Sequence, residues 1–294
     1  MRVGTRGSAL ALAQARWVAE RLQERGEPVE IVEVVTLGDR GGVGGSISDK
    51  SRWVSELERA LDEGRIDVAV HSAKDVPSEL PAGLELAAIP ERADARDAIC
   101  GARSLESLAG GARVGTSSLR RTAQIRAARD DLDVVPMRGN VDTRLRKLLE
   151  GECDALVLAL AGLQRLGRED DATGTLDELV PAAGQGALAL EARAGEALAV
   201  ASLRDPLASA CVAVERELVR ALGASCNTPV GAHARALDAG ELELTVWIGL
   251  PDGSAWMSDR LNGDAHSGLG LVVAGRLLAA GARELLREAE AQVA

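Results

Sequence analysis

One segment, residues 114–121, combines the residue types of an anion-binding site. A predicted strand ends at Thr116, and Ser118 begins a predicted helix. Arg120 and Arg121 lie in the first turn of that helix. A helix start attracts anions through its free N–H groups and its dipole, and guanidinium groups bind carboxylates. Because the same dipole disfavours cations in the first turn, two arginines there indicate a bound anion. The alternative is ordinary capping by serine, with arginines that face solvent.

Two further turns have the same character. Residues 4–8 include the end of a predicted strand and contain Arg6 and Ser8, and residues 138–144 follow another predicted strand. The stretch 113–147 contains nine Arg or Lys and four Asp, although the formal net charge of the whole chain is −11. A local basic region of this kind draws polyanionic ligands. A solvated helix face is the alternative, but it would mix the two signs more evenly.

Residues 70–77 offer a candidate acid or base. A predicted strand runs into a polar turn that carries the adjacent pair Lys74 and Asp75 and is closed by Pro77. A carboxylate at the carboxyl end of a strand is a candidate for proton transfer. The alternative is that Asp75 caps the turn and Lys74 is solvated. We expect His71 to be a packed strand residue rather than a catalyst.

Cysteine usage singles out Cys226. The four cysteines form no CxxC pair, and with only three histidines they give no zinc spacing, so no metal site is predicted. Cys226 lies in a Gly- and Pro-containing loop, where a thiol can be a nucleophile or an attachment point. Cys100, Cys153 and Cys211 lie in apolar or helical contexts, which are typical of cysteine as a small core residue.

The elements that would position these residues alternate between short strands and longer helices. A β-α-β-α-β order predicts a parallel, doubly wound sheet, and this order occurs twice. The first half has predicted strands at 2–5, 29–36 and 66–71 and helices at 8–23 and 52–63; the second has strands at 113–116, 132–137 and 155–160 and helices at 118–129 and 141–150.

The two halves also repeat each other in sequence. Residues 3–5 match residues 114–116, residues 13–16 match residues 123–126, and residues 63–67 match residues 150–154. Two similar α/β halves that face each other form a cleft, and ligands bind beyond the carboxyl ends of the strands. The last third differs: it predicts a helix at 211–222, a hairpin of strands at 241–250 and 254–261, and one long helix at 269–289.

Composition excludes several function classes. The chain has 294 residues, of which 46% are hydrophobic and 27% charged, so it can bury a sizeable core. It contains four Trp and no Phe or Tyr, which argues against a nucleic-acid site built from stacked aromatic rings. Its apolar runs reach about nine residues, too few to cross a bilayer. No signal peptide is visible, and we expect a cytoplasmic protein that binds neither nucleic acid nor membrane.

In combination and in order, these segments resemble the porphobilinogen deaminase family, also called hydroxymethylbilane synthases. The resemblance covers nearly the whole chain. Its carriers are residues 4–8, 70–77, 114–121, 137–141, 161–167 and 181–187, and Cys226 with Pro229 and Gly231. The implied fold has two periplasmic-binding-protein-like doubly wound α/β domains and a smaller α+β C-terminal domain. The implied boundaries are 1–91 with 187–204 for domain 1, 94–180 for domain 2, and 207–294 for domain 3.

The resemblance implies a transferase of tetrapyrrole (haem) biosynthesis. The family joins four porphobilinogen molecules head to tail, releases ammonia and forms the linear tetrapyrrole hydroxymethylbilane. It does so on a dipyrromethane cofactor held by a thioether, and Cys226 matches the attachment position. The implied partner is porphobilinogen, and the implied state is a monomer. A non-catalytic two-lobed binding protein for small carboxylates is the alternative.

The resemblance also assigns roles to single residues. Asp75 matches the catalytic aspartate, which would stabilise the cation formed when ammonia leaves, and Gln185 matches a polar hinge residue. Lys50 and Trp53 fall in the lid segment, where the sequence departs from the usual family pattern. The implied cofactor- and substrate-binding residues are Arg6, Ser8, Ser72, Lys74, Thr116, Ser118, Arg120, Arg121, Arg138, Gly139, Arg144, Arg165 and Gln185.

Overall fold

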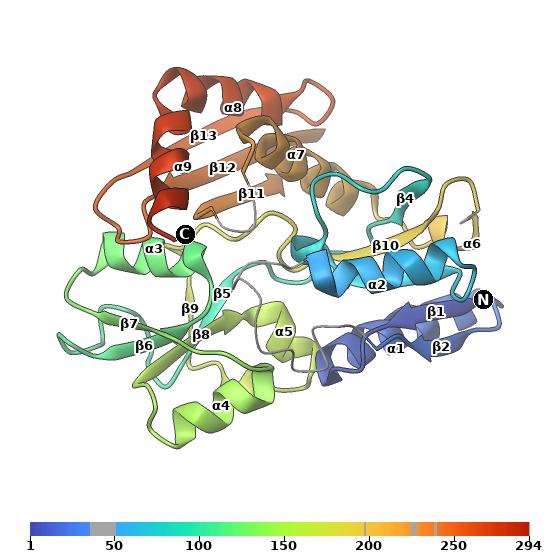
Figure 1. The fold of residues 1–294 in the computed structure, drawn as a ribbon, viewed down its shortest axis with the longest axis horizontal. Coiled ribbons are helices and arrows are strands. Elements are labelled where there is room, and N and C mark those ends of the chain that lie inside the picture. The colour runs from blue at the N-terminus through green and yellow to red at the C-terminus, as the bar shows by residue number, and fades with distance from the viewer. Residues whose placement is uncertain (36–50, 197, 225–227, 238–239, 294) are drawn as a thin grey trace. The chain divides into compact units, whose positions relative to one another are not determined.

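The computed structural model describes residues 1–35, 51–196, 198–224, 228–237 and 240–293, without the side chains of residues 51–53 and 198 (Figure 1). The described residues divide into two compact units. Unit 1 contains residues 1–93 and 186–212, and unit 2 contains residues 94–185 and 213–294. The division into three domains stays a prediction.

Unit 1 is built on a five-stranded sheet in the order β2-β1-β3-β10-β4. Its strands are β1 (Arg2–Thr5), β2 (Glu30–Glu33), β3 (Val68–Ser72), β4 (Leu84–Ala88) and β10 (Leu188–Arg193), and its helices include α1 (Ala9–Gln23), α2 (Ser51–Asp62) and α6 (Leu198–Ala201). Successive strand residues point to opposite faces. Val68 and Val70 therefore pack with α1, whereas Ala69 packs with α2, so apolar cores lie on both faces.

Unit 2 repeats this design with the strand order β7-β6-β8-β5-β9. Its five strands are β5 (Asp97–Cys100), β6 (Arg113–Thr116), β7 (Asp133–Pro136), β8 (Ala155–Ala159) and β9 (Gly174–Leu176). Three helices follow the parallel strands: α3 (Leu119–Ala128), α4 (Val141–Leu149) and α5 (Leu160–Arg165). Ile125 of α3 packs on one face of the sheet, and Leu145 of α4 packs on the other. The predicted doubly wound class is confirmed in both units.

The internal repeat has a structural counterpart in an Arg–Asp pair. In unit 1, Asp67 accepts a hydrogen bond from the backbone N–H of Arg2 at 2.6 Å and pairs with its guanidinium group at 2.6 Å. In unit 2, Asp154 accepts from the backbone N–H of Arg113 at 2.7 Å and pairs with its guanidinium group at 3.3 Å. In each half, an aspartate at the equivalent position, Asp67 or Asp154, thus ties the first strand to the start of the third strand.

The strands of the predicted β-α-β-α-β order are parallel, as expected, but each sheet also contains antiparallel strands that were not predicted. Strand β10 runs antiparallel to β3 and β4, and β5 runs antiparallel to β8 and β9. These strands come from segments that the β-α-β pattern does not include. Each reaches its sheet through a connection other than a crossover helix, so nothing requires it to run parallel to its neighbours.

The C-terminal part of unit 2 contains a three-stranded antiparallel sheet of β11 (Val230–Ala236), β12 (Glu241–Gly249) and β13 (Trp256–Asp264). The predicted hairpin is confirmed, although its second strand begins two residues later than expected. The predicted single helix at 269–289 was wrong: α8 (Leu269–Ala279) and α9 (Ala282–Ala291) are separate (Figure 1). Gly281 has a φ of 101°, a conformation that interrupts a right-handed helix.

The remaining long helix, α7 (Pro206–Leu222), begins five residues before the predicted start at Cys211. Two short 3-10 helices, at Ala73–Asp75 and Glu169–Asp171, also lie among the described residues. Among the described residues, no helix is both long enough and apolar enough to span a membrane.

The turn between β12 and β13 gives a stability prediction. Gly253 has a φ of 78°, and a Cβ there would lie 2.5 Å from the backbone nitrogen of Ala127 in α3. Gly111 is a matched control because its φ is 77° and a Cβ there would meet nothing within 4 Å. We expect Gly111→Ala to lower the free energy of unfolding by about 1 kcal/mol. Gly253→Ala should cost about 1–3 kcal/mol more, through overpacking. Urea unfolding of both variants measures this difference, and equal losses would contradict it.

Candidate active site

The predicted site residues of unit 2 gather at one edge of its sheet. Strands β6, β7 and β8 are parallel, so their carboxyl ends lie at the same edge, where α3, α4 and α5 begin. Thr116 ends β6, and Ser118 is the N-cap of α3. The other predicted residues near this edge are Arg138 and Gly139 between β7 and α4, and Arg144 in α4, whereas Arg165 is the last residue of α5.

The hydroxyl groups at the start of α3 hold the turn together. The Ser118 Oγ accepts a hydrogen bond from the backbone N–H of Arg121 at 3.4 Å. The Thr116 Oγ1 accepts from the backbone N–H of Ser118 at 3.3 Å. Serine capping, the alternative weighed for this motif, is therefore present, but the arginines beside it do not face solvent.

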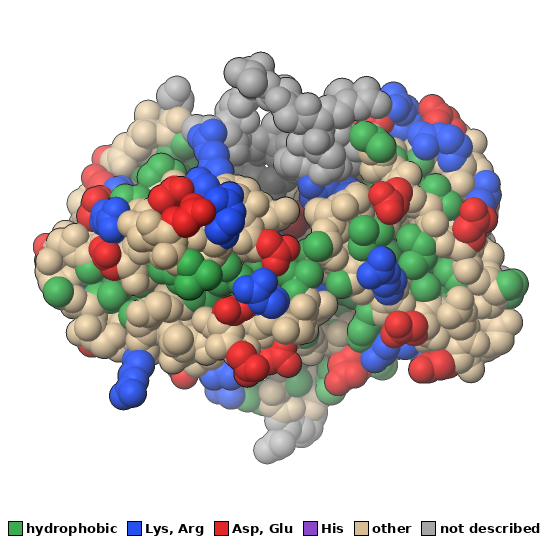
Figure 2. All heavy atoms as spheres, turned by 90° about the horizontal axis from the view of Figure 1, so that it is seen from below, with side chains coloured by type: hydrophobic (Ala, Val, Ile, Leu, Met, Phe, Trp, Pro, Cys, Tyr) green, Lys and Arg blue, Asp and Glu red, His purple; other side chains and the backbone are tan. Residues whose placement is uncertain are grey.

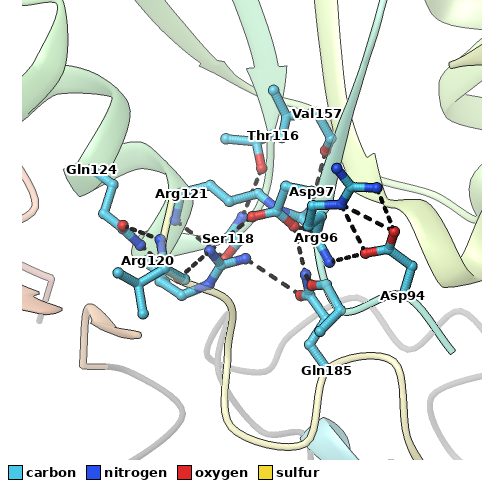
Figure 3. Close-up of polar contacts among 12 residues, drawn as sticks. Asp94, Arg96, Asp97, Thr116, Ser118, Arg120, Arg121, Gln124, Val157 and Gln185 are labelled. Carbon is cyan, nitrogen blue, oxygen red and sulfur yellow. Dashed lines mark hydrogen bonds and ion pairs between the residues drawn. The ribbon is translucent and has the colours of Figure 1, made fainter. Parts of the chain in front are cut away.

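Arg120 and Arg121 are buried around one carboxylate, that of Asp97 (Figure 3). Arg120 Nη1 lies 2.8 Å from Asp97 Oδ2. Arg121 donates from Nε and Nη2 to Asp97 Oδ1 at 3.0 and 2.7 Å. Burial disfavours the ionised form of Asp97, but the two guanidinium groups outweigh that effect and lower the pKa of the carboxyl.

Gln185 and the backbone complete the shell around these groups. Gln185 Nε2 donates to Asp97 Oδ1 at 2.7 Å and to the carbonyl oxygen of Ala95 at 2.6 Å. Arg120 Nη1 also donates to the carbonyl oxygen of Val180 at 2.8 Å. That carbonyl accepts a further hydrogen bond from Gln124 Nε2 at 3.0 Å, and Gln124 Oε1 accepts from the Val180 N–H at 2.7 Å. The segment that contains residues 180–185 is thus fixed to α3.

Further cations lie at the same edge. Burial lowers the pKa of Arg144, and repulsion from Arg121 lowers it further. Arg144 Nε donates to the carbonyl oxygen of Gly139 at 2.7 Å. Gly139 has a φ of 117°, and a Cβ there would lie 2.8 Å from Thr143 Cγ2, so glycine is required. Burial also lowers the pKa of Arg165, to about 10.

This donor set fits a ligand that carries several carboxylates. Asp97 neutralises only one of the two guanidinium charges that it contacts, and Arg144 adds to the repulsion. The Arg120 Nε is buried without a hydrogen-bond acceptor among the described residues. Buried cations are stable only when paired, so the described part of unit 2 leaves a demand for negative charge at this edge. A dipyrromethane carries four carboxylates and would meet that demand.

On the face drawn in Figure 2, basic and acidic side chains are interspersed, so no large patch of one charge is seen there. Two of the positive charges of the site, those of Arg120 and Arg121, are buried instead.

The predicted residues of unit 1 lie where β1 and β3 end. Ser8 is the N-cap of α1, and its Oγ accepts a hydrogen bond from the Ala11 N–H at 3.3 Å. Gln14 Nε2 of α1 donates to Ser72 Oγ at 2.8 Å, which joins the helix to the end of β3. Lys74 and Asp75 follow in the short 3-10 helix Ala73–Asp75, and both are half-buried. Arg6 is also half-buried.

A buried acid–base pair supports the end of β3. His71 Nε2 lies 3.0 Å from Glu191 Oε2 of β10, and both side chains are buried. Burial raises the pKa of Glu58 on α2, and the negative charge of Glu191 raises it further. His71 is therefore a packed residue of the strand, as expected, and its contact with Glu191 was not foreseen.

Several predicted residues fall outside this description. Lys50 and Cys226 lie outside the described residues, and so does the side chain of Trp53. Their assigned roles stay predictions, as do the ligand roles of the arginines.

Sequence reasoning missed Asp97, Glu191 and the role of Gln124. Asp97 and Glu191 lie in strands whose other residues are nearly all buried and mostly apolar. A charged residue is almost never buried unless it is paired, so an acid in such a run is a usable signal. Gln124 was noted only as part of the repeated residues 13–16 and 123–126. In the structure, Gln14 and Gln124 each form a hydrogen bond to a segment that lies beside their helix.

Two protein-family models match the chain. The model described as "Porphobilinogen deaminase, dipyromethane cofactor binding domain" matches residues 1–201. The model described as "Porphobilinogen deaminase, C-terminal domain" matches residues 209–279. The chain belongs to the porphobilinogen deaminase family. The resemblance stated from the sequence is thereby confirmed, and so is the dipyrromethane as the cofactor of the family's binding domain.

Relatives match over nearly the whole length. The porphobilinogen deaminase of Thiobacillus denitrificans is 48% identical over 297 residues, which are 97% of this chain and 97% of that protein. The porphobilinogen deaminase of Thermus thermophilus is 46% identical over 295 residues, which are 97% of this chain and 98% of that protein. That of Deinococcus deserti is 46% identical over 302 residues, 97% of each.

Solved structures give a more distant likeness. A periplasmic substrate-binding protein of an ABC transporter from Coxiella burnetii is 17% identical, with a TM-score of 0.41 over 74% of this chain and 96% of that chain. At this level the likeness carries no argument about function. The alternative of a non-catalytic binding protein has no other support.

The described cysteines give a prediction about thiol reactivity. Cys100, Cys153 and Cys211 are buried. Burial raises the pKa of Cys100 to about 12 and also raises that of Cys153. Because the thiolate is the nucleophile, about one Cys100 in 10,000 is reactive at pH 8. We expect iodoacetamide at pH 8 to leave all three unlabelled in the native protein and to label them in urea, as peptide mass spectrometry would show. Labelling of native Cys100 at the rate of an exposed cysteine would contradict the assignment.

Proposed function

We propose that this chain is a transferase that condenses four porphobilinogen molecules head to tail into hydroxymethylbilane. Each condensation releases ammonia and takes place on a covalently bound dipyrromethane, and water then cleaves the finished tetrapyrrole from it and supplies the hydroxyl group of the product. Membership of the porphobilinogen deaminase family over residues 1–201 and 209–279 carries this proposal. The arginines where the parallel strands of unit 2 end, which we call the cationic edge, support it independently. Every pyrrole of the substrate and product carries an acetate and a propionate, and these carboxylates need cationic partners.

The arginines of unit 2 have the role of holding these carboxylates. Guanidinium groups bind carboxylates in a fixed two-point geometry, and they do so best where water is excluded. We assign this role to Arg120, Arg121, Arg138, Arg144 and Arg165. The hydroxyl groups of Thr116 and Ser118, and Gly139 and Gln185, set the positions of these arginines. In unit 1 the corresponding binding residues are Arg6, Ser8, Ser72 and Lys74.

Asp75 has the role of the catalytic carboxylate. The reaction breaks the C–N bond of the substrate aminomethyl group, forms a C–C bond to a pyrrole α-carbon, and removes the proton of that carbon. Positive charge develops as ammonia leaves, and an adjacent carboxylate stabilises it. The same carboxylate can accept a hydrogen bond from the pyrrole N–H and take up the released proton. The bound dipyrromethane supplies the α-carbon from which the chain grows, and Cys226 is the proposed attachment point.

We further propose that the protein is cytoplasmic and that it acts as a monomer. The monomeric state is supported because one chain supplies both sets of proposed binding residues. Lys50 and Trp53 would contribute lid contacts to the substrate. Size-exclusion chromatography with light scattering tests the oligomeric state.

The attachment of the cofactor is tested by intact mass. We expect the purified protein to exceed the mass of its polypeptide by two pyrrole units. Cys226→Ser should remove this excess, because no thioether can form, whereas Cys153→Ser should retain it. A wild-type mass equal to that of the bare polypeptide, even after incubation with porphobilinogen, would contradict the proposed function. An adduct that survives Cys226→Ser would refute only the attachment point.

The role of Asp75 is tested by Asp75→Asn. We expect this variant to carry the cofactor, as its intact mass would show, but to elongate the chain at least a hundredfold more slowly, since the loss of an acid–base group costs about 10²–10⁴ in rate. Glu79→Gln, an exposed carboxylate in the same loop, is the control and should keep the wild-type rate. A wild-type turnover number for Asp75→Asn, measured as tetrapyrrole formed per enzyme, would refute the assigned role.

A further inference from the structure

Asp97 reaches the cationic edge through the direction of its strand. Strand β5 runs antiparallel to β8, and Asp97 pairs in register with Ala159, the last residue of β8. The first residue of β5 therefore lies where the parallel strands of unit 2 end. Asp97 and Ile99 point to the same face of the sheet. Ile99 packs against Ile125 of α3, so that face is the one on which Arg120 and Arg121 lie.

The single carboxylate of Asp97 keeps two like charges together. Burial lowers the pKa of Arg120, Asp97 opposes that effect, and repulsion from Arg121 lowers the pKa further. The Asp97 side chain is fully buried, and both arginines are nearly so. Without the carboxylate, two neighbouring guanidinium groups would face each other out of contact with water. Such an arrangement is strongly unfavourable, so the side chains would move apart.

The contacts also fix the direction of each guanidinium group. Arg121 uses Nε and Nη2 for Asp97 and Nη1 for the carbonyl oxygen of Val157, at 3.2 Å. Arg120 uses Nη1 for Asp97 and Val180, and its Nη2 lies 3.4 Å from Gln185 Oε1. Each group is therefore held from at least two sides (Figure 3). The common member of both sets of contacts is Asp97.

We propose that Asp97 is a positioning residue of the deaminase reaction. Its buried carboxylate holds Arg120 and Arg121 at the separation and orientation in which they receive carboxylates of the pyrrole chain. Asp97 itself does not contact substrate. This inference rests on the proposed function, because it concerns how the same site binds its ligand.

A purely structural role for Asp97 predicts different behaviour. Loss of a structural ion pair lowers stability and the amount of folded enzyme, and each folded molecule then binds substrate normally. Loss of a positioning group raises the KM for porphobilinogen in molecules that are folded and carry the cofactor. The KM of enzyme that is folded and carries the cofactor therefore separates the two roles.

The experiment compares Asp97→Asn, Asp97→Glu and a matched control. Asp94→Asn is the control because Asp94 lies three residues away and also pairs with an arginine, Arg96, at 2.7 Å. Arg96 lies outside the buried cluster and is largely exposed. For each variant, circular dichroism verifies folding, intact mass verifies the cofactor, and initial rates give KM and kcat.

We expect Asp97→Asn to raise the KM for porphobilinogen about ten- to a hundredfold, the range that follows from loss of a hydrogen bond to a charged group. Asp97→Glu keeps the carboxylate but displaces it by one methylene, so it should raise KM by more than twofold but less than Asp97→Asn. Asp94→Asn should stay within twofold of the wild type. A folded, cofactor-loaded Asp97→Asn enzyme with wild-type KM overturns the proposal. If Asp97→Asn does not fold, a wild-type KM for Asp97→Glu overturns it.

A double-mutant cycle tests whether Asp97 acts through the arginines. Arg121→Met should also raise KM, and the double variant should show far less than the product of the two single effects. Effects that multiply would overturn the proposal, because they would mean that the two residues act independently.

The proposed function fails separately from this inference. If the wild-type enzyme makes no tetrapyrrole from porphobilinogen, the proposed function is wrong. If the wild type is active and Asp97→Asn matches its KM, only the positioning role is wrong.

Discussion

The site of unit 2 depends on one interaction, the sharing of the buried Asp97 carboxylate by two arginines and a glutamine. This carboxylate joins β5, the first turn of α3 and the segment that ends at Gln185. A buried charge is tolerated only when its partners are in place, so folding of the unit and assembly of the cationic edge occur together. The arginines are consequently in position before any ligand arrives, and little conformational entropy is lost when it binds.

The duplicated halves show how one design serves two tasks. Both begin with the same four residues, Arg-Val-Gly-Thr, and both tie that strand to a later aspartate. They differ at the end of the third strand. Unit 1 has Lys74 and Asp75 there, whereas the corresponding positions of unit 2, Ala161 and Gly162, carry no charge. The proposed catalytic carboxylate and the densest group of arginines thus belong to different units.

Local pattern was sufficient for most of the elements that carry the site, because strands ending in helix starts have strong signals in sequence. The strand Arg2–Thr5 and the serine caps of α1 and α3 follow directly from residue types. The antiparallel strands β5 and β10 could not be derived in this way, since their direction depends on pairing between distant segments. For that reason Asp97 and Glu191 were missed. The break before α9 was missed because Gly281 lies within a run of good helix formers.

The location of the positive charge determines what kind of recognition is physically available. The chain carries a net charge of −11, so attraction of an anionic substrate depends on local groups of positive charge rather than on the net charge. Charges on the surface would in any case be screened beyond about 10 Å at 0.1 M salt. Buried guanidinium groups act over short distances in a medium of low polarity. A carboxylate that pairs with a guanidinium group there is bound strongly, whereas a carboxylate without a cationic partner is excluded. In the proposed function, selection of a pyrrole with two carboxylates would therefore depend on the positions of Arg120 and Arg121, both of which contact the buried Asp97 carboxylate.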